Sequence, residues 1–270
     1  SVSCMYEEFL EDIAQTNGLR EVNTYLKLLA GLGAILLCLL SQSYIGPLFI
    51  AIVLSVTILS LAKIDARTYG GLFILPFTFA IMSVAVIILI SGGEETFWSW
   101  NPLPWLSLSV TEESLNEGFF VFCRVIGGMS ALIFIALTTP MTDLFVVMRQ
   151  CRVPEVVLDL AMMIYRSIFM IMDQLVQTYH AQVMRLGYGS FRESIQSFST
   201  LCGAVFIGSW SAGEDLIRAM DARCYDGKFA VLGETRPIEV LPFITVALFL
   251  GVSSVVVFLA RDLPLLGAGS

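Results

Sequence analysis

Four long stretches of the chain contain no Asp, Glu, Lys or Arg. They run between Lys27 and Lys63, between Arg67 and Glu94, between Arg124 and Asp143, and between Glu239 and Arg261. A helix of roughly 20 apolar residues crosses the hydrocarbon core of a bilayer. The first stretch is too long for one span, and its Ser41–Pro47 segment has the polar, Gly and Pro residues of a turn. The pattern therefore predicts five membrane spans, near residues 23–41, 45–62, 70–91, 118–138 and 238–260.

The region 139–236 has a mixed pattern, in which apolar positions recur at helical spacing between charged ones. Helices are expected to begin at Thr139-Pro140, at Val153-Pro154 and at Ser190, which forms a capping box with Glu193. The interval 194–213 carries no charge and could be a sixth span, although its many Ser, Thr and Gly residues argue against it.

Glycines indicate where two of these helices stop. Gly187 and Gly189 are expected to end the second helix of the region, and Gly227 the third, because glycine commonly follows the last helical residue. Arg185 and Arg223 each lie just before such a stop.

Composition places the chain among membrane proteins. It has 270 residues, of which 57 % are hydrophobic and 14 % charged, and its mean hydropathy is +0.82; a soluble domain has about 25 % charged residues. The predicted fold class is all-α, a polytopic membrane protein with about five transmembrane helices and a cytoplasmic domain of long amphipathic helices. The expected parts are 1–138 with four spans, 139–236 with the amphipathic helices, and 237–270 with the last span and a tail.

Charge orients the predicted spans. The stretch 92–117 contains several Glu residues but no Lys or Arg, whereas 139–236 holds most of the basic residues of the chain. Basic residues concentrate on the cytoplasmic side of membrane proteins. We therefore expect 92–117 to face outward and 139–236 to lie in the cytoplasm of a multi-pass protein of the cell membrane.

The chemistry-bearing residues indicate no catalytic centre. The chain has no phosphate-binding loop of the G-x-x-x-x-G-K-[ST] type and no protease or esterase motif. Six cysteines without C-x-x-C spacing and a single histidine indicate no zinc site and no disulfide framework. Neither a metal, a cofactor nor a nucleic-acid partner is expected.

Two features of the region 139–236 admit a functional and a structural interpretation. Arg185 and Arg223 could each complement the dipole of a helix end, or together form a two-point docking surface for carboxylates of a partner. Asp159, Arg166 and Asp173 recur every seven residues and could line an ion path, or could form intramolecular pairs.

The chain resembles a known family over essentially its whole length. The likeness includes Leu137-Thr138-Thr139-Pro140 and Tyr165-Arg166, and is most specific in the segment Arg218-Ala219-Met220-Asp221-Ala222-Arg223-Cys224-Tyr225-Asp226-Gly227. In these segments the sequence resembles the transmembrane T component of energy-coupling factor (ECF) transporters, of the CbiQ type that serves cobalt import.

The resemblance implies a docking role for two short segments. In the family, two Ala-Arg-Gly-like triplets tip two cytoplasmic coupling helices, and each arginine enters a groove of one ATPase subunit. The matching triplets here are Met184-Arg185-Leu186 and Ala222-Arg223-Cys224. Both keep the arginine and lose the usual glycine, and the first also loses its alanine, so the geometry of the tips is expected to differ.

The resemblance also implies the partners and the mechanism. Two ATP-binding cassette subunits would hydrolyse ATP, and the coupling helices would relay their motion to a substrate-binding S component in the membrane. That component would be CbiM-like, with a small CbiN-like subunit where one is present, and the substrate would be cobalt, with nickel or a vitamin as alternatives. The chain itself would be a non-catalytic scaffold. A stand-alone secondary transporter and an intramembrane enzyme are the remaining hypotheses.

Overall fold

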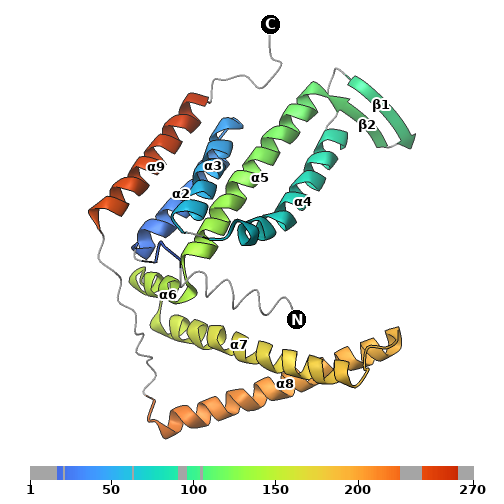
Figure 1. Cartoon of the computed structure of the whole chain (residues 1–270), viewed down its shortest axis with the longest axis vertical. Helices are drawn as coiled ribbons and strands as arrows, with labels where there is room; N and C mark the ends of the chain where they lie inside the picture. The colour runs from blue at the N-terminus through green and yellow to red at the C-terminus, as the bar shows by residue number, and fades with distance from the viewer. Residues whose placement is uncertain are drawn as a thin grey trace. The chain divides into compact units, whose positions relative to one another are not determined.

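A computed structural model describes residues 17–20, 22–62, 64–90, 96–103, 106–225 and 239–260 of the chain. Helices dominate this part of the chain, as the sequence predicted (Figure 1). The elements are α2 (Thr24–Leu40), α3 (Ile45–Ser60), α4 (Ala66–Ile90), β1 (Thr96–Leu103), β2 (Leu106–Thr111), α5 (Glu112–Thr138), α6 (Met141–Gln150), α7 (Glu155–Met184), α8 (Phe191–Ala222) and α9 (Val240–Leu259).

The described elements fall into two compact units. One contains α2 to α5, the two strands and α9, and the other contains α6, α7 and α8. The division along the chain falls between Pro140 and Met141.

The first unit holds a helix at each of the five predicted spans. By length and apolar composition, three helices among the described residues are long enough to cross a membrane, within Ala66–Ile88, Ser114–Thr138 and Val240–Leu259. The other two, α2 and α3, are apolar but have only 17 and 16 residues. At 1.5 Å per residue these two helices are about 25 Å long, less than the roughly 30 Å hydrocarbon core. The helix α8, which contains the ambiguous interval 194–213, is not among these candidates.

The helix α5 organises this unit because α2, α3 and α4 all pack against it, while α9 packs against α2 and α3. The buried core consists of small and branched apolar residues, including Ala34, Cys38, Ile50, Ile58 and Ala131. Small residues let helices approach closely, which matters in lipid because helix association there depends on packing rather than on water exclusion. Large apolar side chains of α4 such as Leu75 and Phe79 instead remain exposed on the outer surface of the unit.

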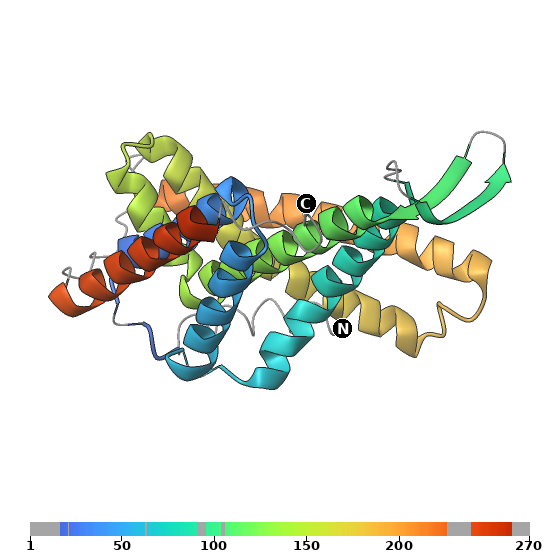
Figure 2. The same cartoon turned by 90° about the horizontal axis from the view of Figure 1, so that it is seen from above.

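A two-stranded hairpin joins α4 to α5, which the sequence analysis did not predict (Figure 2). β1 and β2 pair antiparallel, with Trp100 opposite Leu108 and Ser99 opposite Ser109. From its glutamates, the sequence predicts only an outward-facing connection here. Its alternation of Leu and Ser over residues 106–109 is the signal that would have indicated a strand.

The second unit consists of two long helices and a short one. α7 and α8 have 30 and 32 residues, pack against each other and are joined at one end by the Arg185–Ser190 connection. α6 packs on α7, where the rings of Phe145 and Tyr165 meet edge to face at 6.0 Å. At 1.5 Å per residue, α7 and α8 each reach about 45 Å.

The beginnings of these helices agree closely with their sequence signals. Ser190 is the N-cap of α8 and its hydroxyl accepts a hydrogen bond from the amide of Glu193 at 3.4 Å, which is one half of the predicted capping box. Pro154 is the N-cap of α7, and α6 begins directly after Pro140, so each proline precedes the first helical residue instead of occupying it.

The adjacent glycines of α5 make a matched pair for testing this packing. A Cβ atom at Gly127 would lie 2.8 Å from the carbonyl oxygen of Pro47 and 2.9 Å from Sγ of Cys38, whereas one at Gly128 would meet nothing within 4 Å. We expect Gly127→Ala to lower the free energy of unfolding by about 1–3 kcal/mol, because overpacking strains a backbone contact that cannot move aside. Gly128→Ala should leave it unchanged or raise it, since Ala favours a helix by about 1 kcal/mol over Gly. Thermal unfolding of both variants in one detergent checks this, and equal effects would contradict the packing of α3 on α5.

Candidate functional site

The end of α7 presents Arg185 through a well-defined backbone turn. Arg185 is the C-cap of the helix, and the amide of Gly187 donates to the carbonyl of Gln182 at 3.0 Å. The amide of Leu186 donates to the carbonyl of Val183, also at 3.0 Å. These two bonds define a Schellman motif, whose key residue adopts a left-handed conformation. That residue is Leu186, with φ 59°, and not the glycine that the sequence analysis expected.

The end of α8 has the same structure. Arg223 is the C-cap, the amide of Tyr225 donates to the carbonyl of Met220, and the amide of Cys224 donates to the carbonyl of Asp221, both at 3.1 Å. Cys224 has φ 52° and is the left-handed residue. The glycine expected to end this helix, Gly227, lies outside the described residues.

The two triplets therefore share one backbone geometry. In Met184-Arg185-Leu186 and in Ala222-Arg223-Cys224, the last helical residue, the C-cap and the left-handed residue follow in the same order. This third position is where the family resemblance implies a glycine. Leu186 and Cys224 adopt the left-handed conformation there, at a steric cost of about 1–2 kcal/mol for an L-residue. A third Schellman motif, with Arg152 at φ 63°, ends α6.

The side chains of both triplets are exposed. Met184 and Leu186 are 84 % and 82 % exposed, although they are large apolar residues, and they flank the exposed Arg185. Ala222, Arg223 and Cys224 are exposed as well. An exposed arginine between two exposed apolar side chains is typical of a contact surface. In such a surface, apolar area surrounds the ion pair that the arginine forms with a carboxylate.

A network of side-chain hydrogen bonds braces the first tip against α8. The side-chain amide of Gln182 donates to the carbonyl of Ser197 at 3.0 Å, and the hydroxyl of Ser197 donates to the carbonyl of Gly187 at 2.7 Å. The hydroxyl of Tyr188 donates to the side-chain oxygen of Gln182 at 2.8 Å. These hydrogen bonds fix the connection that begins with Arg185. No motif in the sequence indicated the residues that form them.

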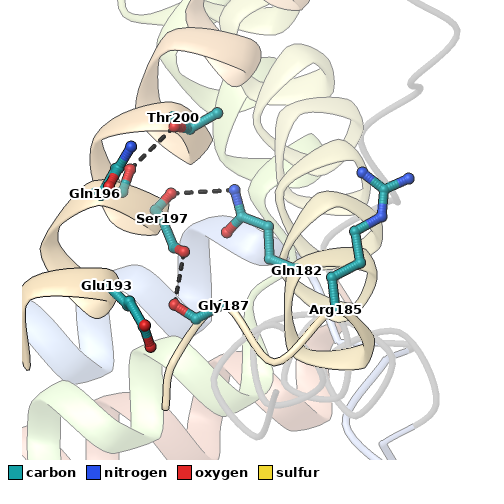
Figure 3. Close-up of a pocket in the computed structure, with 7 residues that line it drawn as sticks. All are labelled: Gln182, Arg185, Gly187, Glu193, Gln196, Ser197 and Thr200. Atoms are coloured by element: carbon teal, nitrogen blue, oxygen red, sulfur yellow. Dashed lines mark hydrogen bonds between the residues drawn. The ribbon is translucent and has the colours of Figure 1, made fainter. Parts of the chain in front are cut away.

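The brace borders a groove of about 280 Å³, lined by Gln182, Arg185, Gly187, Glu193, Gln196, Ser197 and Thr200. Figure 3 shows Gln182 extending to Ser197 while the guanidinium of Arg185 points away from that contact. Within the part of the chain that the structure describes, Arg185 forms no ion pair.

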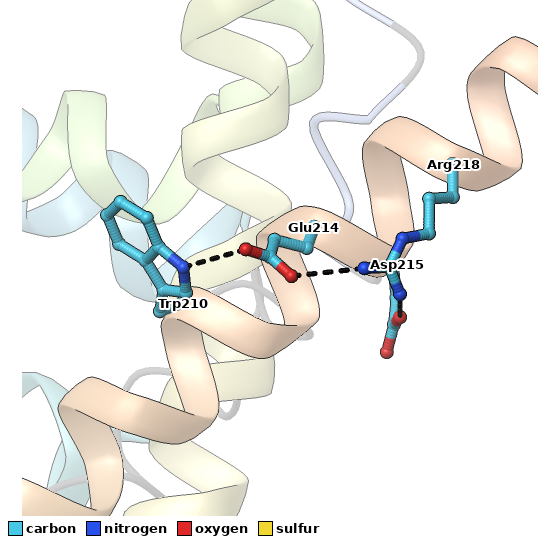
Figure 4. A network of polar contacts seen from close by, with 4 residues as sticks. All are labelled: Trp210, Glu214, Asp215 and Arg218. Carbon is cyan, nitrogen blue, oxygen red and sulfur yellow. Dashed lines mark hydrogen bonds and ion pairs between the residues drawn. The ribbon is translucent and has the colours of Figure 1, made fainter.

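Near the end of α8, Arg218 and Arg223 differ in their ion pairing among the described residues. Arg218 lies between two carboxylates of its own helix, 3.2 Å from Glu214 and 3.4 Å from Asp215, and Glu214 also accepts a hydrogen bond from the indole of Trp210 (Figure 4). Arg223 forms no ion pair with any described residue. The guanidinium of Arg218 is thus engaged within α8, whereas that of Arg223 is available to a partner.

The other candidate residues do not form a site. Asp159 is buried, Arg166 and Asp173 are exposed, and their helix α7 is not among the candidate membrane spans. Among the described residues, no group of His, Cys, Asp and Glu could hold a metal ion.

The left-handed conformation of Leu186 and Cys224 leads to a prediction about the tips. We expect Leu186→Gly and Cys224→Gly to stabilise the two helix ends by about 0.5–1 kcal/mol, because glycine adopts positive φ without the Cβ penalty but loses more entropy on folding. Amide exchange at Gly187 and Tyr225 should slow by about two- to fivefold in the respective variants. Leu186→Ala, which keeps the Cβ atom, is the control and should bring no such protection. Faster exchange in the glycine variants would contradict the assigned geometry.

Comparison with known proteins gives one consistent family. The family described as cobalt transport protein CbiQ matches residues 15–232. A putative fused cobalt transport protein CbiMQ of Methanocorpusculum labreanum is 38 % identical over 96 % of this chain, and the chain spans 43 % of that fused relative.

Two further relatives carry transporter names. The cobalt transport protein CbiQ of Rhodobacter capsulatus is 24 % identical over 78 % of this chain and 81 % of its own length. The energy-coupling factor transporter transmembrane protein EcfT of Limosilactobacillus fermentum is 26 % identical over 67 % of this chain and 71 % of its own.

The family match covers the first four predicted spans, both arginine triplets and the connection between α7 and α8. The matched residues make up most of the chain and include two of the three helices long and apolar enough to cross a membrane. The chain belongs to the CbiQ family of cobalt transport proteins and is a transmembrane T component of an energy-coupling factor transporter.

Proposed function

We propose that this chain couples two ATP-binding cassette ATPase subunits to a substrate-binding membrane subunit, through Arg185 at the end of α7 and Arg223 at the end of α8. The observation that supports it best is the identical backbone turn at the two helix ends, each with an exposed arginine at the C-cap. A repeated presentation of the same side chain suits a partner that is itself present in two similar copies.

The chemistry of arginine suits this role. Its planar guanidinium binds carboxylates through two parallel hydrogen bonds, and its charge persists at every physiological pH. The surrounding contact area, which excludes water from each arginine–carboxylate pair, would come from Met184, Leu186, Ala222 and Cys224. In this proposal the chain is a non-catalytic subunit, which agrees with the transport-protein names of its relatives.

The length of α7 and α8 suits the transmission of movement. A helix is a stiff rod, and two rods of about 45 Å that pack against each other can carry a displacement at one end over that distance. Closure and opening of the ATPase dimer on ATP binding and hydrolysis would move the two tips. The membrane helices would pass this movement to the substrate-binding subunit.

Relatives and charge distribution suggest the partner in the membrane and the location. The name of the fused relative joins CbiM to CbiQ, which favours a CbiM-like substrate-binding subunit, with a CbiN-like small subunit as a further candidate, and cobalt as the substrate ahead of nickel or a vitamin. Most of the chain's Lys and Arg residues lie in 139–236, which favours a cytoplasmic position for α6, α7 and α8, in a multi-pass protein of the cell membrane.

Co-purification with the ATPase subunits tests the docking role. We expect wild-type chain to retain both ATPase subunits and Arg185→Glu/Arg223→Glu to lose them at least tenfold, because reversal of both charges turns two attractive pairs into repulsive ones. Each single variant should retain a weakened complex, since one tip still docks.

The control for this experiment is Arg166→Glu, which makes the same charge change at an exposed position in the middle of α7. It should co-purify with the ATPases as the wild type does. Undiminished binding by the double variant, with an intact membrane protein, would disprove the assignment of the two arginines.

A further inference from the structure

Two side chains, one just before α2 and one in its first turn, hold the carboxyl end of α5. The side-chain amide of Asn17 donates a hydrogen bond to the carbonyl of Leu137 at 2.9 Å. The ammonium group of Lys27, in the first turn of α2, donates to the carbonyl of Thr138 at 3.0 Å. Asn17 is 7 % exposed and Lys27 only 2 %. Two buried donors, far away in the sequence, thus serve the last two carbonyls of one helix.

The segment just before α2 also binds the end of α3. The amide of Gly18 donates to the carbonyl of Ala62 at 3.3 Å, and a Cβ atom at Gly18 would overlap the carbonyl oxygen of Leu61. Glycine is therefore required for this approach. We call Asn17, Gly18 and Lys27 the clamp. It joins the carboxyl ends of α3 and α5 at the end of the bundle where α2 begins (Figure 1).

The clamp answers a physical need at the end of α5. The final carbonyls of a helix have no partner within it, and burying them without a donor is unfavourable. The positive charge of Lys27 also complements the negative end of the helix dipole. A neutral donor could cap the carbonyl of Thr138 equally well, so the charged donor at this position suggests a role beyond capping.

The position of the clamp along the chain indicates that role. Lys27 holds the carbonyl of Thr138, and the division between the two structural units falls only two residues later, between Pro140 and Met141. The hydroxyl of the intervening Thr139 is buried and has no hydrogen-bond partner among the described residues. The clamp thus fixes α5 up to its last residue, directly before the chain enters α6.

We propose that Lys27 and Asn17 are positioning residues for energy coupling, because they keep the end of α5 rigid where movement enters the membrane helices. With the clamp in place, a displacement that arrives through residues 139–141 moves α5 as a whole. Without it, the last turn of α5 unwinds locally and absorbs the displacement. This inference rests on the proposed coupling function, and it assigns to the clamp a step that the two arginine tips do not perform.

The test measures transport and ATP hydrolysis in the same preparation. The complete complex, with its ATPases and substrate-binding subunit, is reconstituted into liposomes, and the amount of cobalt(II) imported per ATP hydrolysed is compared between variants. We expect Lys27→Met, which keeps the length of the side chain but removes its donor, to lower this ratio about threefold or more. ATP hydrolysis and the amount of assembled complex should stay near the wild-type values. Lys27→Arg, which restores a charged donor, should recover the ratio.

Two further variants keep the test decisive. Asn17→Ala removes only the neutral half of the clamp, so it replaces Lys27→Met if the latter does not assemble, and it should lower the ratio to a smaller extent. Ser130→Ala removes another buried hydrogen bond of α5, from its hydroxyl to the carbonyl of Gly127, and should leave the ratio unchanged. Hydrogen exchange in the last turn of α5 should accelerate in Lys27→Met and not in Ser130→Ala.

The outcomes separate this inference from the proposed function. If the clamp variants keep the wild-type import per ATP, or lose hydrolysis and assembly in proportion, the clamp is only structural and the inference is wrong. The Arg185→Glu/Arg223→Glu complex is prepared alongside. If that variant keeps its ATPases, the docking function fails, whatever the clamp variants do.

Discussion

The last carbonyl groups of a helix have no partner within it, and a lipid environment supplies no water to replace one. Most of the informative structure in this chain is a response to that constraint. α6, α7 and α8 each close on themselves through a Schellman motif with a left-handed residue after the C-cap. In the first unit, side chains from distant positions in the sequence donate hydrogen bonds to such carbonyls. Asn17 and Lys27 donate to the last two carbonyls of α5, and Arg124 donates to the carbonyl of Ser41 at the end of α2, at 2.6 Å.

The two ways of ending a helix suit two different tasks. A Schellman motif needs nothing beyond its own residues, so a helix that ends with one can project an exposed C-cap residue toward a partner. Arg185 and Arg223 occupy that position. An end held by a distant side chain is fixed to its neighbours instead, as α5 is through Lys27. The proposed coupling function would use both kinds of end, one to contact a partner and one to pass movement on.

Several features followed from the sequence because they depend on nearby residues alone. The charge-free stretches located α2, α3, α4, α5 and α9, since transfer into lipid is decided by the hydropathy of about 20 consecutive residues. Ser190 indicated the start of α8 because an N-cap hydroxyl binds an amide only three residues away. The arginine triplets were recognised from family resemblance, and their place at the two helix ends agrees with the glycines that follow them. At the end of α7 the sequence pointed to Gly187, whereas the left-handed residue is Leu186.

The tertiary structure decided the rest. In the sequence, Lys27 is a charged residue at the boundary of a predicted span and Asn17 is a polar residue without a motif. In the structure, both side chains donate hydrogen bonds to carbonyls more than a hundred positions away. The brace of Gln182 and Ser197 likewise exists only because α7 and α8 lie side by side. Apolar patterning by itself located the five apolar helices of the first unit. Which polar side chain satisfies which helix end depended on how those helices pack, because a hydrogen bond requires a donor and an acceptor within about 3 Å, and the fold alone brings distant residues that close.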